Sequence, residues 1–198
     1  LRRLIARVEP TRVSDHLCFV GADGIHSHEL LPLPHAEEAV SHVADQISRV
    51  QDALGRRILV ENPSTYLRLE PAEMDEAAFV RAVVERADCD LLLDLNNVLV
   101  NAHNHGFDPE RYLAAMPLAR VGEYHLAGAT PSGSLLIDTH TGPVPEAVLD
   151  LYRHALAHIG PRPTVVEWDT DTPDFETTAA EARRVRQIEQ AHLQEMAS

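Results

Sequence analysis

Cysteine, positive charge and long apolar runs are all scarce in this 198-residue chain. Cys18 and Cys89 are the only thiols, which excludes a disulfide framework and a thiolate-rich zinc site. Any bound metal must therefore be held mainly by nitrogen and oxygen atoms. No apolar run approaches the roughly 18 residues of a transmembrane helix, and no signal-peptide pattern opens the chain. We therefore expect no membrane partner and a cytoplasmic location.

Positive charge is scarce enough to give a formal net charge of −14, which limits the kinds of partner that the chain can bind. An acidic chain repels phosphate backbones, and its arginines are scattered along helical stretches, so we expect no nucleic-acid partner. The acidic excess serves either solubility or a bound cation. Signatures of other chemistries are missing as well: there is no G-x-S-x-G elbow, H-E-x-x-H helix or P-loop.

What the chain does contain is an alternation of short apolar runs with longer stretches of helical periodicity. This alternation is typical of parallel β/α units. The predicted strands are 12–19, 57–61, 90–95, 120–125 and 164–168. The predicted helices are 36–54, 75–87, 109–115, 145–159 and 175–191, and residues 1–8 resemble the tail of an earlier helix.

Five β/α units predict an α/β protein, but five strands are too few to close a barrel of eight. We interpret residues 1–198 as a single domain, the C-terminal portion of a TIM (β/α) barrel that is incomplete at its N-terminus. A doubly wound open sheet is the alternative. It is disfavoured because no Gly-rich turn follows the first strand to bind a dinucleotide or phosphate.

Acidic and imidazole side chains stand at the end of every predicted strand, where the chemistry of parallel β/α proteins is concentrated. Burying so many unpaired charges would cost several kcal/mol each, and a shared cation removes that cost. Imidazole together with carboxylate suits iron, manganese or zinc. A lone histidine is more often structural than a ligand, and Glu61 with Glu167 could instead act as acid and base without metal. The convergent positions nevertheless favour a metal site.

Eight motifs in order along the chain resemble the DUF692 (UPF0276) family, also called the multinuclear non-haem iron-dependent oxidative enzymes. They are SDHL (14–17), LLPLP (30–34), VENPSTYL (60–67), LLDLNNV (92–98), NHGFD (104–108), EYHLAG (123–128), IDTH (137–140) and VEWD (166–169). The resemblance covers nearly the whole chain. It departs from the family at Asp15, where the family more usually has Glu.

The resemblance implies a TIM barrel with two or three irons that uses dioxygen to modify a ribosomally made precursor peptide, often at cysteine. A small partner protein commonly recognises the leader segment. The implied iron ligands are His16, Glu61, Asp94, His125, Asp138, His140 and Glu167, with Asn97 and His105 as weaker candidates. Glu61 is the best candidate to bridge two ions, and Glu61, Asp94 and His125 are the catalytic candidates. The family also has earlier strands, one ending in a His-Gly pair, and this chain starts after them.

Two other functions stay open at this stage. A manganese- or zinc-dependent sugar isomerase or phosphodiesterase-like barrel would use a related Glu-Asp-His-Glu shell and would not need oxygen. A truncated remnant that binds a peptide or partner without turnover is the non-catalytic alternative.

Overall fold

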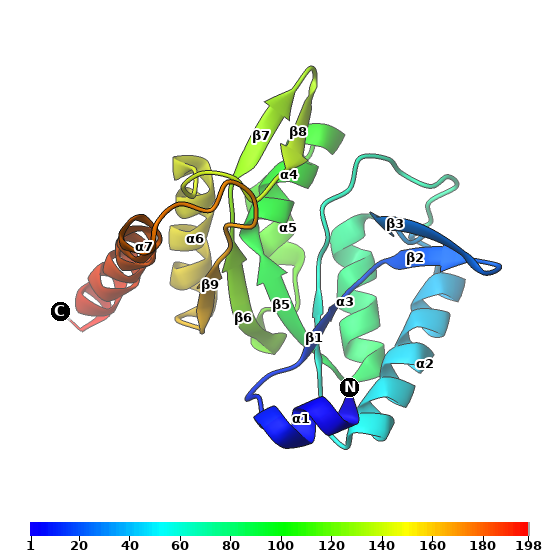
Figure 1. Ribbon diagram of the computed structural model, residues 1–198. Helices are drawn as coiled ribbons and strands as arrows, with labels where there is room; N and C mark the ends of the chain where they lie inside the picture. Colours follow the sequence, from blue (N-terminus) through cyan, green and yellow to red (C-terminus); the bar gives the residue numbers. More distant parts are fainter. Residues whose placement is uncertain (198) are drawn as a thin grey trace. The chain divides into compact units, whose positions relative to one another are not determined.

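A five-stranded sheet with the order β1-β4-β5-β6-β9 organises the protein in the computed structural model, which describes residues 1–197 (Figure 1). Neighbouring strands run parallel in the pairs β1–β4, β4–β5 and β6–β9. Each strand is followed along the chain by at least one helix, so the α/β prediction and its five β/α units are confirmed. The five strands are β1 Ser14–His16, β4 Leu59–Glu61, β5 Asp90–Asp94, β6 Val121–Leu126 and β9 Thr164–Val166.

The helices begin and end close to the predicted positions because their ends carry sequence signals. Asp75 accepts a hydrogen bond from the Ala78 backbone N–H at the start of α3, and Gly55 ends α2 with a left-handed backbone. The helices are α1 Arg2–Val8, α2 Glu37–Leu54, α3 Glu76–Ala87, α4 Leu95–His105, α5 Pro109–Ala115, α6 Glu146–Ile159 and α7 Phe175–Met196, with a 3-10 turn at Leu118–Arg120.

One helix and two hairpins were not predicted. Helix α4 follows β5 directly, where the sequence predicts no helix. Two antiparallel hairpins also occur, β2 Phe19–Ala22 with β3 Ile25–Leu31 and β7 Ala129–Ser132 with β8 Leu135–Asp138. The predicted strand 12–19 was therefore too long, because β1 ends at His16 and Phe19 already belongs to the first hairpin.

The chain forms two compact units. The first comprises Leu1–Pro63, Leu67–Leu92 and Ala115–Gly122. Helices α2 and α3 lie side by side in it (Figure 1) and bury apolar side chains such as Val40, Phe79 and Val83. Cys89 is buried in this unit, and burial raises the pKa of its thiol to about 12. The Cys18 thiol is only partly buried.

The second unit comprises Ser64–Tyr66, Leu93–Ala114 and the chain from Glu123 onward. Its core gathers around α6, where Tyr152 packs edge-on against Tyr124 of β6. Helix α7 packs on α6 (Figure 1). The buried Glu181 carboxylate joins α7 to the start of α6, since it accepts hydrogen bonds from the Val144 N–H and from Arg184. Within residues 1–197, every helix is too short or too polar to cross a membrane.

Candidate metal centre

His125 and Glu167 meet because two neighbouring strands are in register. β6 pairs with β9 so that His125 lies opposite Val165, and side chains two residues apart on a strand point to the same face. Glu167 extends β9 by one backbone hydrogen bond, from its N–H to the carbonyl of Leu126. This arrangement brings the Glu167 Oε1 atom to 3.2 Å from His125 Nδ1.

Asp94 completes a group of three ligand atoms in the second unit. It ends β5 and caps α4, where its Oδ1 atom accepts a hydrogen bond of 2.7 Å from the Asn97 N–H. The side chain is fully buried. Asp94, His125 and Glu167 each offer one ligand atom, and these atoms lie within 4.8 Å of one another. A cation at this position would offset the charge of the buried carboxylate.

Asp138 and His140 form a second pair of ligand candidates in the same unit. Asp138 ends β8, and the Nε2 atom of His140 lies 2.9 Å from its Oδ1 atom. The Nε2 atom is buried, and within residues 1–197 it makes no aligned hydrogen bond. The other carboxylate oxygen of Glu167, Oε2, lies 3.6 Å from His140 Nδ1. Glu167 therefore turns one oxygen toward each histidine.

The charge around His140 changes its proton affinity. The neighbouring Asp138 carboxylate is the main influence and raises the pKa of His140 to about 9, against desolvation, which lowers it. Glu167 and Asp169 add to the rise. Without a cation the ring therefore holds a positive charge at neutral pH. A pocket that stabilises a proton on this imidazole also favours a metal cation in its place.

Asn97 and His105, the two weaker ligand candidates, make other contacts. Asn97 lies in the first turn of α4 and donates its backbone N–H to Asp94. His105 is the last residue of α4, and its Nε2 atom lies 2.7 Å from the Thr65 hydroxyl, which also contacts the buried Asn101 side chain. The distances around His105 fit a hydrogen bond that ties residues 64–66 to α4.

His16 and Glu61 belong to the first unit and pair there. They face each other in the register of β1 and β4, each at the carboxyl end of its strand. Their side chains approach to 3.5 Å between His16 Nε2 and Glu61 Oε2. Glu61 is buried, with 6% of its surface exposed, whereas the His16 side chain is half-exposed.

Four polar residues around Asp138 and His140 were missed by the sequence analysis as contributors to the site. The Asn96 Nδ2 atom donates to Asp138 Oδ1 at 2.7 Å, and the Ser64 hydroxyl donates to Asp138 Oδ2 at 3.2 Å. The Tyr66 hydroxyl accepts from the Asp138 N–H, and Asp169 contacts His140. Their motifs, ENPSTY, DLNNV and VEWD, are visible in the sequence, but a contact between segments far apart along the chain has no local signal.

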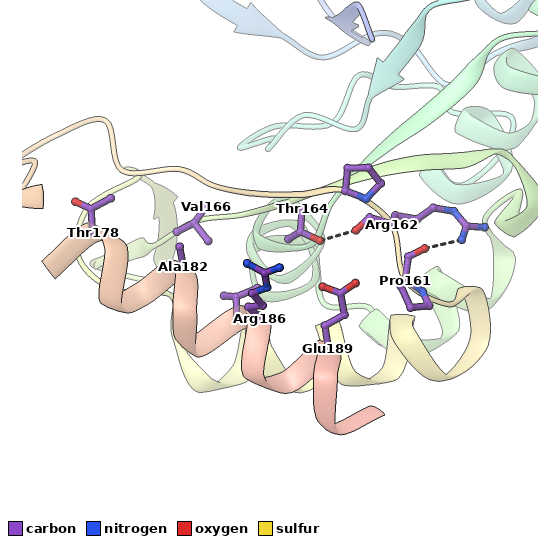
Figure 2. Close-up of a pocket in the computed structure, with 10 residues that line it drawn as sticks. Pro161, Arg162, Thr164, Val166, Thr178, Ala182, Arg186 and Glu189 are labelled. Atoms are coloured by element: carbon purple, nitrogen blue, oxygen red, sulfur yellow. Dashed lines mark hydrogen bonds between the residues drawn. The ribbon is translucent and has the colours of Figure 1, made fainter. Parts of the chain in front are cut away.

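A cavity of about 560 Å³ also lies in the second unit, between β9 and α7 (Figure 2). Thr164 and Val166 of β9 line it together with Arg186 and Glu189 of α7. Thr164 and Val166 alternate with Val165 and Glu167, so the cavity and the metal ligands lie on opposite sides of this strand. The cavity is therefore separate from the candidate metal centre.

The donor set fits a first-row transition metal. Imidazole and carboxylate ligands without thiolates suit iron, manganese or zinc. Two ligand atoms bound at right angles, each about 2.1 Å from one ion, lie about 3.0 Å apart. The 2.9 Å between His140 Nε2 and Asp138 Oδ1 agrees with that separation. The residues present could therefore hold an ion of iron, manganese or zinc.

Comparison with known proteins gives concordant results. A family model described as "RiPP precursor modification enzyme MbnB/TglH/ChrH" matches residues 1–190. A UPF0276 protein of Acaryochloris marina is 50% identical over 184 residues, which is 93% of this chain and 67% of that protein. A UPF0276 protein of Anaeromyxobacter sp. is 47% identical over 193 residues, covering 98% of this chain and 68% of the relative. The chain thus spans about two thirds of the length of these relatives.

Among solved structures, a D-psicose 3-epimerase crystallised in the presence of D-fructose is similar to this chain with a TM-score of 0.46 and 16% sequence identity. The matched region covers 97% of this chain and 65% of the epimerase chain. This likeness is too distant to carry an argument.

Proposed function

Because the chain belongs to the MbnB/TglH/ChrH family of RiPP precursor modification enzymes, also named UPF0276 or DUF692, we propose that it takes part in the iron- and dioxygen-dependent modification of a ribosomally made precursor peptide, at cysteine. The observation that carries the proposal is the convergence of Asp94, His125 and Glu167, whose ligand atoms lie within 4.8 Å of one another. A buried carboxylate beside an imidazole and a second carboxylate is a typical environment for a redox-active metal.

The proposed ligand set is larger than this group of three. Glu61 ends β4, the neighbour of β5 in the sheet, and we assign it to bridge two irons with His16 beside it. Asp138 and His140 would serve a further ion that shares Glu167. Asn97 and His105 remain weaker candidates, and the contact between His105 and Thr65 makes a hydrogen-bonding role more natural for that histidine. Glu61, Asp94 and His125 are the proposed catalytic residues, with two or three irons in total.

The chain's own residues would prepare this centre. The α4 N-terminus fixes the Asp94 carboxylate through the Asn97 N–H, and the two oxygens of Glu167 face two different histidines. Burial of Asp94 keeps water from competing for the ligand positions. Iron bound there would supply one-electron redox chemistry with dioxygen, which amino-acid side chains alone do not provide.

The partners proposed follow from the same family. The substrate is a precursor peptide, and a small protein that recognises its leader is a second partner. The net charge of −14 argues against nucleic acid. We place the reaction in the cytoplasm, where precursor peptides are made.

The proposal is tested by loading the purified 198-residue chain with Fe²⁺ under anaerobic conditions. After removal of unbound metal, iron is quantified, and the protein is mixed with synthetic cysteine-bearing candidate peptides, in the presence and absence of a candidate leader-binding protein. Admission of oxygen should change the mass of the peptide at its cysteine. The same mixture kept anaerobic should leave the peptide unchanged.

A His125→Ala variant should lose iron and the mass change together. His158→Ala is the matched control, because His158 lies at the C-terminal end of α6 and its ring bonds to the His154 carbonyl. Absence of bound iron together with an unmodified peptide would refute the proposal. Turnover of a sugar or phosphodiester without oxygen would replace it with the hydrolase or isomerase alternative.

A further inference from the structure

His140 is held in an unusual backbone conformation. Its φ angle is +48°, in the left-handed region that residues with a Cβ atom seldom adopt. Such a conformation persists where surrounding contacts over-determine it, and it is common at functional sites. Asp169 supplies two of the contacts that hold His140 in place.

Asp169 contacts His140 at two points. Its backbone N–H donates a hydrogen bond of 3.0 Å to the His140 carbonyl, and its Oδ2 atom lies 3.0 Å from the ring Nδ1 atom. The Glu167 Oε2 atom is farther from the same nitrogen, at 3.6 Å, beyond hydrogen-bonding distance. Asp169 is therefore the hydrogen-bond partner of Nδ1. Its side chain is 74% exposed, so it is not needed to fill the core.

The two ring nitrogens consequently have different surroundings. Nδ1 donates its hydrogen to Asp169, which leaves the buried Nε2 atom, 2.9 Å from Asp138 Oδ1, as the nitrogen available to a cation. A histidine that binds a metal through one nitrogen almost always donates the hydrogen of the other to a carboxylate, a carbonyl or water. That hydrogen bond fixes the tautomer and the orientation of the ring.

The Asp138 carboxylate, the other member of the Asp138–His140 pair, is also fixed by hydrogen bonds. Asn96 donates to one oxygen of Asp138 and Ser64 donates to the other, at 2.7 Å and 3.2 Å. Asn96 is fully buried, and within residues 1–197 its Oδ1 atom has no hydrogen-bond partner. A buried polar group left in that state needs an explanation, and an ion or an ordered water close to Asp138 supplies one.

We infer that Asp169 is a positioning residue, which orients His140 so that Nε2 and Asp138 together hold a cation. This inference rests on the proposed metal centre and adds a residue that binds no metal itself. Asp169 acts through the ring, by keeping the hydrogen on Nδ1. An amide at the same position could donate to Nδ1 and so favour the opposite tautomer, with the hydrogen on Nε2.

The test measures cation binding instead of turnover. The purified chain is titrated with Mn²⁺, and free Mn²⁺ is followed by electron paramagnetic resonance, which yields the number of sites and the affinity of each. We expect Asp169→Asn to weaken one class of site about ten- to hundred-fold, the usual effect of removing an outer-shell partner. The sites that do not use His140 should keep their affinity. Asp169→Glu should restore much of the loss.

Asp171→Asn is the matched control. It removes the same charge from the same loop, at an exposed position two residues farther along the chain. Circular dichroism checks that each variant is folded. Equal affinities for the wild type and Asp169→Asn would overturn the inference alone, and so would equal weakening by Asp169→Asn and Asp171→Asn. If the wild type takes up neither Mn²⁺ nor Fe²⁺, the proposed metal centre fails and the inference fails with it.

Discussion

At the scale of single residues, Glu167 occupies a central position, because its two oxygens face His125 and His140. Glu167→Gln removes the negative charge and half of the ligand capacity while keeping the shape of the side chain. We expect it to lower cation affinity more than about 100-fold, since loss of a ligand should exceed the loss of an outer-shell partner. Calorimetric titration with Mn²⁺ measures the change.

Glu189→Gln is the control for that substitution. Glu189 lines the cavity between β9 and α7, on the other side of the strand, and carries the same charge. Its replacement should leave the affinity within about twofold of the wild type. A similar loss in both variants would mean that net charge, and not the position of Glu167, governs cation binding.

Proton competition at His140 gives a second residue-scale prediction. Its pKa is raised to about 9, so below that pH a cation that binds Nε2 must displace a proton. The apparent affinity of this site should rise about tenfold per pH unit from neutral pH and level off above about pH 9. Titrations at several pH values measure the slope. A pH-independent affinity would show that His140 binds no cation.

The sequence names strand-end residues as ligand candidates, and the structure brings the ligand atoms of Asp94, His125 and Glu167 within 4.8 Å of one another, but the sequence does not predict how these side chains are held. Asp94, His125 and Glu167 could be found because parallel strands bring their carboxyl ends to one edge of a sheet. The contacts of Asn96, Ser64 and Asp169 with Asp138 and His140 join segments separated by 29 to 74 positions. Periodicity is a local property, so it carries no information about such contacts.

At the scale of elements, there are identifiable reasons why helix α4 and the first hairpin were not predicted. Helix α4 carries Asn96 and Asn97 in its first turn and His103 and His105 in its last turn, residues of low helix propensity, although Asp94 and Gly106 cap its two ends. The first hairpin turns at Asp23 and Gly24, both with positive φ, and Asp-Gly is among the strongest hairpin signals. Its strands were hidden because the first predicted strand was extended through Phe19.

Gly128 gives a prediction at the same scale. A Cβ atom there would collide with the backbone carbonyl oxygen of Thr141, so the glycine lets the segment after β6 approach the segment after β8. Gly128→Ala should push the segment that carries Asp138 and His140 away from the segment after β6. We expect a loss of about 2–4 kcal/mol in the free energy of unfolding, within the range of severe steric substitutions.

Urea unfolding measures this loss, and Gly133→Ala is the control. Gly133 lies in the turn between β7 and β8 with a positive φ and open space around its Cα. Its substitution should cost only about 1 kcal/mol, the cost of a left-handed backbone for a residue with a Cβ atom. Equal costs at the two positions would argue that backbone conformation, and not the close approach to Thr141, is what matters at Gly128.

At the scale of the whole molecule, a metal centre couples cation binding to folding. A ligand at about 100 times its Kd stabilises the native state by about 2.7 kcal/mol. For a chain of this size each kcal/mol shifts the melting temperature by roughly 2–4 °C, so saturating Mn²⁺ should raise it by about 5–10 °C. Differential scanning fluorimetry measures the shift, and EDTA should reverse it. An equal shift in His125→Ala would contradict a specific centre.

The burial of Cys89 has a practical consequence. Its thiol, with a pKa of about 12, stays protonated and shielded at neutral pH, whereas Cys18 is partly exposed. Burial and the nearby Asp15 and Glu61 carboxylates raise the pKa of the Cys18 thiol too, so the contrast between the two cysteines is one of accessibility. A maleimide fluorophore should label the folded protein once, at Cys18, and peptide mapping would identify the site. Because Cys18 lies two positions from His16, quenching of the dye by paramagnetic Mn²⁺ or Fe²⁺ would report metal arrival optically, without any knowledge of the natural peptide.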